Sequence, residues 1–316
     1  MNGPRAIDPP RGAAAVRLAR AVAGLTAAAL FAAAGCGRNT VTRPQSTADR
    51  VVSLAPSVTE IVCAIGGADR LVGRTSACDF PSDVLAKVPV VGGFGAPSME
   101  LLLAAKPTLI LDVALSDETT GAKIRNLGLR RERVACGNLD EVPQAIESVG
   151  RLLHLDANAQ RLAEAMKSRI RALRDAAGRA GPRPRVFVEI WCDPLTTIGS
   201  RSFLSELVYL AGGRSIGDDV PKDYFQVSSE WVVARAPDIV LCLYPSPGHS
   251  ASDKVLAREG WHDVPAVRER RVYDGFDNNM ILRPGPRVLE SIESLCAAIA
   301  GTPSAAPGAP LPAGAR

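Results

Sequence analysis

The chain contains one segment twice, 130 residues apart, and this duplication constrains the fold more than any other feature. Residues 98–112 read SMELLLAAKPTLILD, and residues 228–242 read SSEWVVARAPDIVLC. In both copies a serine precedes a glutamate by two residues, and a proline separates the helical pattern from an apolar run. Serine is a good N-cap, an acid in the first turn complements the helix dipole, and proline ends a helix. We therefore expect the same helix–strand unit in each half of the chain.

The two glutamates of this repeat, Glu100 and Glu230, are open to two interpretations. Each one alone is explained by compensation of its helix dipole. Two of them in equivalent places, one in each half, form a pseudo-symmetric acidic pair instead. Such a pair suits a partner that is itself two-fold.

Short apolar runs alternate with helical patterns from residue 50 to residue 300, which predicts strands covered on both faces in parallel α/β layers. One long helical stretch interrupts the alternation. In it Leu162, Met166 and Ile170 recur at helical spacing, and Leu173 continues the stripe. The fold class that we expect is α/β, with two Rossmann-like lobes around central parallel sheets, over 50–155 and 181–300, joined by a single long rigid helix over 156–180.

Local patterns predict three further helix starts and one further strand. Ser57 and Glu60 have the spacing of a capping box, and Asp140 and Asp156 each precede a helical pattern that they are expected to cap. The apolar residues of 133–135 predict a strand.

The N-terminus has the pattern of an export signal. Arginines precede an apolar stretch, Ala21 to Ala34, that is too short for a transmembrane helix, and Gly35 and Cys36 follow. The segment from Ala33 to Cys36 resembles a bacterial lipobox, with Ala33 in the place where leucine is usual. We expect a signal peptide over 1–36 with Cys36 as the lipidation site, a flexible tether over 37–49 and a disordered tail over 301–316. The protein is then exported, and either periplasmic or anchored to the membrane by a lipid; cleavage without a lipid and a buried Ala-rich helix are the alternatives.

Charge and cysteine content exclude several classes. The formal charge is +4, and the arginines of the leader supply most of it. The remaining chain therefore lacks the excess of positive charge that binding to nucleic acid requires. No C-x-x-C motif occurs, which disfavours a zinc ribbon or a thioredoxin-like site. The cysteines after Cys36 either form disulfides, whose pairing the sequence does not select, or serve as small buried hydrophobes; they are Cys63, Cys78, Cys136, Cys192, Cys242 and Cys296.

Five motifs carry a resemblance to a known family, and they cover residues 50–300. They read VVSLAPSVTEIVCAIGGADRLVG, VGGFGAPSMELLLAAKPTLIL, RVFVEIW, QVSSEWVVARAPDIVL and LRPGPRVLESIESL. Together they resemble the periplasmic cobalamin-binding proteins of ABC importers, part of a group that binds cobalamin, haem and ferric siderophores. The resemblance implies a monomeric, non-enzymatic protein that grips a corrinoid or another bulky chelate between its lobes, as cargo rather than as a cofactor. It also implies that Glu100 and Glu230 dock onto arginines of the two transmembrane subunits of a permease with its ATPase.

The same resemblance assigns ligand-binding residues. Phe94 in VGGFG, Trp191 at the end of RVFVEIW and Tyr224 before QVS fall at or beside positions that line the cleft, and Asn279 and Arg283 fall where the family places an acid and an arginine. Large aromatic side chains bury much area at low entropic cost, which suits a macrocycle.

The sequence departs from the family pattern at two places near these residues. Ala77 stands where an aromatic residue is expected, and Asn279 replaces the acid, although Asp277 is two residues away.

Three other functions remain open. A siderophore- or haem-binding member of the same group is the nearest alternative. A receptor for free metal ions needs several converging histidines, but the three present, His154, His249 and His262, are dispersed, and we predict no metal site. An exported enzyme is the third alternative, and the chain has no G-x-S-x-G, H-E-x-x-H or P-loop motif that would support it.

Overall fold

The computed structural model describes residues 49–113, 118–246 and 248–301. The expected signal peptide with Cys36, the tether up to residue 48 and the tail from residue 302 lie outside these ranges. Among the residues described, no helix combines the length and the apolar character that crossing a membrane requires.

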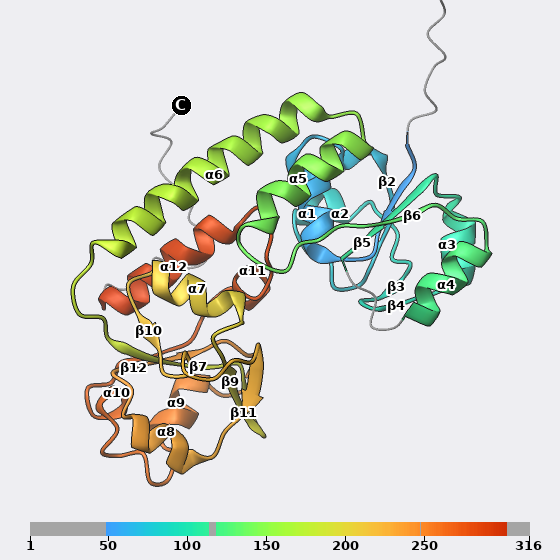
Figure 1. Cartoon of the computed structure of the whole chain (residues 1–316). Helices are drawn as coiled ribbons and strands as arrows, with labels where there is room; N and C mark the ends of the chain where they lie inside the picture. The colour runs from blue at the N-terminus through green and yellow to red at the C-terminus, as the bar shows by residue number, and fades with distance from the viewer. Residues whose placement is uncertain (1–48, 114–117, 247, 302–316) are drawn as a thin grey trace, which may run out of the picture. The chain divides into compact units, whose positions relative to one another are not determined.

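Two four-stranded parallel sheets, one in each half of the chain, form the frame of the fold (Figure 1). The first has the strand order β2-β1-β5-β6 and the second β10-β7-β12-β13, so each sheet places its first strand in chain order between its second and its third. The two-lobed α/β architecture is thereby confirmed. The strands are β1 (Val51–Ser53), β2 (Leu71–Arg74), β5 (Leu109–Asp112), β6 (Arg131–Arg133), β7 (Arg185–Glu189), β10 (Arg214–Ser215), β12 (Ile239–Cys242) and β13 (Val272–Tyr273).

The central strands are buried along almost their whole length, which explains why they appear in the sequence as continuous apolar runs. Every residue of β1, β5 and β12 is buried, as is all of β7 except Arg185. Parallel strands covered on both faces have no solvent side, so no alternation of polar and apolar residues is possible.

Two small antiparallel sheets project from this frame. A hairpin of β3 (Gly92–Gly93) and β4 (Ala96–Pro97) belongs to the first half, and a sheet in the order β11-β9-β8 belongs to the second. The strands of the second sheet are β8 (Trp191–Cys192), β9 (Leu195–Ile198) and β11 (Tyr224–Gln226). These small sheets carry the aromatic residues of the candidate site.

Helices pack on the sheets and connect their strands. In the first half they are α1 (Pro56–Ala64), the 3-10 turn η1 (Ala68–Arg70), α2 (Ser82–Leu85), α3 (Met99–Ala105), α4 (Glu118–Asn126) and α5 (Glu141–Leu152). After α6 (Asp156–Gly178), the second half contains α7 (Phe203–Leu210), α8 (Ser229–Arg235), α9 (Ala251–Leu256), α10 (Pro265–Arg268), α11 (Asn278–Ile281) and α12 (Val288–Ala300).

The long helix α6 has 23 residues and follows the predicted bounds closely. At 1.5 Å per residue its length is about 34 Å. It packs against α5 of the first half and against α7 and α12 of the second. The contact with α5 is close, because a Cβ atom added at Gly150 would lie 2.2 Å from the Cβ of Ala159. Met166 and Ile170 of the predicted stripe are buried.

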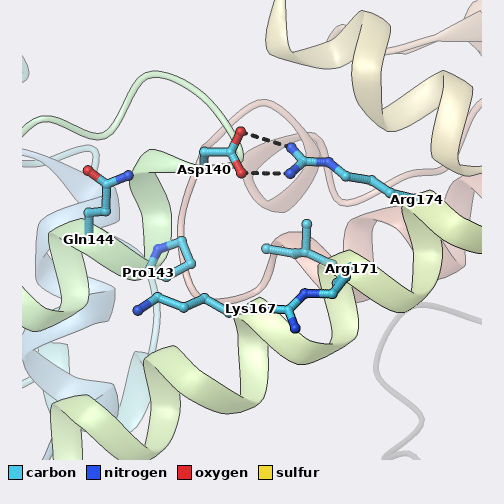
Figure 2. A pocket seen from close by; sticks show the side chains of 7 residues that line it. Asp140, Pro143, Gln144, Lys167, Arg171 and Arg174 are labelled. Carbon is cyan, nitrogen blue, oxygen red and sulfur yellow. Dashed lines mark hydrogen bonds and ion pairs between the residues drawn. The ribbon is translucent and has the colours of Figure 1, made fainter.

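One arginine of α6 joins the two halves of the chain. Arg174 donates two hydrogen bonds to Asp140, of 2.7 and 3.0 Å, and two to Glu206 on α7, of 2.9 and 2.6 Å. Figure 2 shows its pair with Asp140 at the edge of a surface hollow of about 330 Å³ between α5 and α6. Another cation of the hollow, Lys167, bonds to Glu147 and Glu164, so pairing within the protein already neutralises much of the charge there.

The three predicted caps are wrong in detail. Helix α1 begins at Pro56 after Ala55, with no capping side chain, so Ser57 and Glu60 form no capping box. Asp140 caps nothing, because Arg174 holds its carboxylate, and Asn138 accepts the bond from the backbone N–H of Glu141 at 3.0 Å instead.

Asp156 is likewise no cap: it is the first residue of α6. Strand β6 covers 131–133 and shares only Arg133 with the predicted residues 133–135, because its backbone pairs with β5 in the register that places Arg133 opposite Asp112, the last residue of β5.

Candidate functional site

The duplicated segments adopt the same structure in both halves. Ser98 and Ser228 each accept a hydrogen bond of 3.3 Å from the backbone N–H three residues later, which confirms both predicted caps. Each helix has seven residues and ends at a residue in the left-handed region, Lys106 with φ 45° and Ala236 with φ 44°. The proline that follows leads into the buried strand, β5 or β12.

The glutamates of these helices are exposed and unpaired. Glu100 and Glu230 are each the second residue of their helix. Within residues 49–113, 118–246 and 248–301, no ion pair reaches either of them. Hydrogen bonding by Ser228, and then by the backbone N–H of Glu230 itself, holds the pKa of Glu230 below its usual value. Each half of the described chain therefore presents an exposed carboxylate that forms no ion pair within its own fold.

The three predicted aromatic residues are all exposed and all lie on the small sheets. Phe94 is at the tip of the β3–β4 hairpin, Trp191 begins β8 and Tyr224 begins β11; their exposed fractions are 56%, 49% and 46%. The indole N–H of Trp191 donates to the backbone carbonyl of Asp193 at 2.8 Å, which fixes its ring. None of the three is a buried core residue.

Asn279 and Arg283 are brought together by one carboxylate. Asn279 donates to Oδ2 of Asp79 at 2.6 Å, and Arg283 donates to Oδ1 of the same residue at 2.5 Å. Arg283 also donates to the backbone carbonyl of Ala77 at 3.0 Å. The amide at position 279 thus donates a bond to an acid of the distant loop, which a carboxylate could not do when ionised.

A second arginine, four residues further on, forms a more buried bridge. Arg287 donates to both carboxylate oxygens of Glu60, at 2.9 and 2.7 Å, and to Asp277 at 3.2 Å. Its guanidinium also lies 4.1 Å from the centre of the Phe80 ring. Burial lowers the pKa of Arg287. The hydrogen bonds to Glu60 and the negative charges of Glu60 and Asp277 outweigh this effect, so the pKa lies above its usual value.

Sequence reasoning missed Asp79, Glu60 and Arg287 as members of one network. Asp79 and Arg287 were assigned no role, and Glu60 was interpreted as a capping residue. Arg283 and Arg287 flank the Pro-Gly-Pro of one short loop before α12, and this proximity is the signal that could have suggested a shared role. It could not name their partners, which lie more than 200 residues away in the chain.

No metal centre is found in the described part of the chain, where no group of three His, Cys, Asp or Glu side chains is arranged so that it could hold a metal ion. His154 follows α5 in a left-handed turn, His249 is exposed, and His262 pairs with its exposed neighbour Asp263 at 3.0 Å. The six cysteines from Cys63 onwards are all free thiols in the structure.

A family model and individual proteins resemble this chain. The model for the family described as periplasmic binding protein matches residues 51–278. The ABC transporter substrate-binding lipoprotein YvrC of Bacillus subtilis is 30% identical over 257 residues, which are 79% of this chain and 79% of that protein.

Solved structures resemble the fold over most of its length. The heme-binding protein RhuT of Roseiflexus sp. RS-1 has a TM-score of 0.70 at 28% identity, covering 80% of this chain and 98% of that one. The vitamin B12-binding protein BtuF of Vibrio cholerae has a TM-score of 0.67 at 27% identity, covering 80% and 96%. Proteins with this fold thus include binders of two different tetrapyrrole-type ligands.

Proposed function

This chain belongs to the periplasmic binding protein family, and on that premise we propose that it captures a cobalamin-like corrinoid and delivers it to an ABC importer. Membership makes it a non-enzymatic transport component of the group that handles cobalamin, haem and siderophores. The choice of a corrinoid within that group rests on the charges around Arg283.

The exposed aromatic residues support a large, flat ligand. Phe94, Trp191 and Tyr224 come from both halves of the chain, and about half of each residue is exposed among the described residues. Such side chains stabilise a macrocycle by burying apolar area, at little cost in conformational entropy.

The observation that carries the proposal is the neutralisation of Arg283. Its guanidinium is bound by Asp79 at 2.5 Å and lies 3.9 Å from Glu60. Around it three carboxylates, with Asp277 as the third, face two guanidiniums, because Arg287 is the only other cation of this network in the described part of the chain. A group with this balance repels an anion and accommodates a ligand without net charge, such as cyanocobalamin.

Haem and ferric siderophores fit these residues less well. Haem carries two propionates, and many ferric siderophores are anionic, so both call for unpaired cations. Haem iron also takes an axial His, Tyr or Met.

Calorimetric titration with cyanocobalamin, haemin and a ferric catecholate siderophore tests the proposal. We expect one-to-one binding of cyanocobalamin and a rise in Kd of about tenfold or more for Phe94→Ala and for Trp191→Ala, since each removes an aromatic contact. Tyr209→Ala is the matched control, because Tyr209 is an exposed aromatic of α7 that Arg183 covers. If haemin binds and cyanocobalamin gives no heat, the proposal of a corrinoid ligand is refuted and haem is the ligand.

We further propose that Glu100 and Glu230 dock the protein onto the two transmembrane subunits of its permease. Their equivalent places, exposure and lack of ion pairs support this role. Replacing both by glutamine is expected to leave ligand affinity unchanged and to abolish stimulation of the importer's ATPase. Transport at the normal rate by that double variant would refute it.

Export and anchoring complete the proposal. The family is extracytoplasmic, and YvrC is a lipoprotein. The lipobox-like segment supports attachment of this chain to the membrane through Cys36, with the folded body facing the periplasm.

A further inference from the structure

The duplication extends to an exposed aliphatic residue that the fold does not need. Leu103 on α3 and Val233 on α8 occupy equivalent places, and 46% and 36% of their surfaces are exposed. Each stands three residues after the glutamate of its helix and therefore lies on the same helical face. The residues that anchor these helices are different ones, Leu102 and Val232, which are completely buried.

An exposed alanine completes the equivalence. Ala104 and Ala234 follow the aliphatic residues, are exposed in both halves, and lie four residues after the glutamates. One turn of each helix thus presents an acid, an aliphatic side chain and a methyl group side by side. The alanine leaves room for another surface to approach the helix closely.

We propose that these two docking faces, Glu100, Leu103 and Ala104 on α3 and Glu230, Val233 and Ala234 on α8, each bind one of two equivalent membrane subunits through an ion pair and an apolar contact together. The proposal rests on the docking role given to the glutamates above. It adds the chemistry of the partner, which must place a cationic side chain beside an apolar surface, once for each lobe. The two unpaired carboxylates supply the charge complementarity, and the repeat supplies the two-fold form.

The two parts of each face act on different steps of binding. The carboxylates attract the cations of the partner over a distance, and salt screens this effect. Burial of Leu103 and Val233 stabilises the complex once formed, so it acts mainly on the dissociation rate. Binding that survives high salt therefore depends on the aliphatic residues.

The test measures binding of the unmodified protein and its variants to an ABC importer in nanodiscs, chosen as one whose ATPase the unmodified protein stimulates. Leu103→Asp and Val233→Asp are each expected to raise the Kd about tenfold, mainly by faster dissociation, because the acid cannot be buried. Leu101→Asp is the matched control. Leu101 is equally exposed on the same helix, but its counterpart, Trp231, is packed beneath Arg235.

The outcomes separate this inference from the docking role itself. If Leu103→Asp and Val233→Asp bind normally while the glutamine variants of Glu100 and Glu230 do not, the apolar contact is refuted and the ion pairs stand. An equal loss with Leu101→Asp also overturns the assignment of the face. If the glutamine variants bind normally, the docking role fails as well. Unchanged cyanocobalamin titration and circular dichroism exclude misfolding.

Discussion

Removal of Arg287 is expected to destabilise the protein strongly, because it leaves a buried carboxylate without its partner. Only 5% of the Glu60 side chain and 12% of the Arg287 side chain are exposed, and two hydrogen bonds of 2.7 and 2.9 Å join them. Breaking a buried ion pair from one side costs about 3–5 kcal/mol. The Arg287→Met variant also loses the contact with the Phe80 ring, about 0.5–1 kcal/mol at such a site.

The nearest remaining cation limits the loss. Arg283 lies 3.9 Å from Glu60, but Asp79 already holds it at 2.5 Å, so it can compensate only in part. We therefore expect the free energy of unfolding to fall by about 3 kcal/mol in Arg287→Met, the lower end of the range. In the double variant with Glu60→Leu the buried carboxylate is removed together with its partner, and we expect a loss of at most about 1 kcal/mol.

Urea denaturation followed by circular dichroism and by tryptophan fluorescence measures these values. All three tryptophans, Trp191, Trp231 and Trp261, are in the second half of the chain, so fluorescence reports on that half alone. Because Glu60 and Arg287 belong to different halves, the two signals should coincide in the unmodified protein and separate in Arg287→Met.

The matched control is Arg169→Met, which breaks an exposed pair with Glu293 of 3.5 Å and should cost at most about 0.5 kcal/mol. Equal losses in the single and double variants at the buried bridge would refute the reasoning, since they would show that Glu60 needs no partner.

Three further predictions concern other parts of the chain. Arg174→Met should lower the free energy of unfolding by about 1 kcal/mol in urea titrations, because Arg174 serves acids of both halves but is partly screened by solvent; no change would show that the bridge is dispensable. Arg174 holds the pKa of Asp140 below its usual value, so the ion pair contributes to the free energy of unfolding above the unfolded pKa of Asp140, near 4, and this contribution is lost as the pH falls through the folded pKa. Asp140→Asn should therefore make the free energy of unfolding less dependent on pH in that acid range alone, which urea titrations at several pH values measure. Cys36→Ser should move the protein from the membrane to the soluble fraction of cells, and its retention in the membrane fraction would refute lipidation.

The regular part of the fold could be predicted from the sequence because it depends on local pattern. The caps at Ser98 and Ser228 and the bounds of α6 follow from spacing within a few residues. The equal topology of the two sheets follows from the repeat. The same local reasoning assigned Ser57 and Glu60 to a capping box, since it could not know that a distant arginine would hold Glu60.

The polar network could not be predicted, because its partners are far apart in the chain. Arg283 is predicted to bind the ligand, and its bond to Asp79 is an additional contact that the sequence did not reveal. Only the fold brings the loop at residues 77–81 to the segment before α12. The exposure of Phe94, by contrast, has a local reason, since it lies between glycines in a short turn.

The left-handed residues that end the two docking helices are a place to gain thermal stability. Lys106 and Ala236 both adopt positive φ angles that an L-residue takes at a cost of about 1–2 kcal/mol and glycine takes freely. Glycine at each position should stabilise the protein by about 0.5–1 kcal/mol, after its greater loss of chain entropy is subtracted. Both positions lie outside the aromatic site, so the gain is expected to leave ligand affinity unchanged. The two substitutions together are therefore expected to give a more stable form of the protein, suited to use as a ligand sensor.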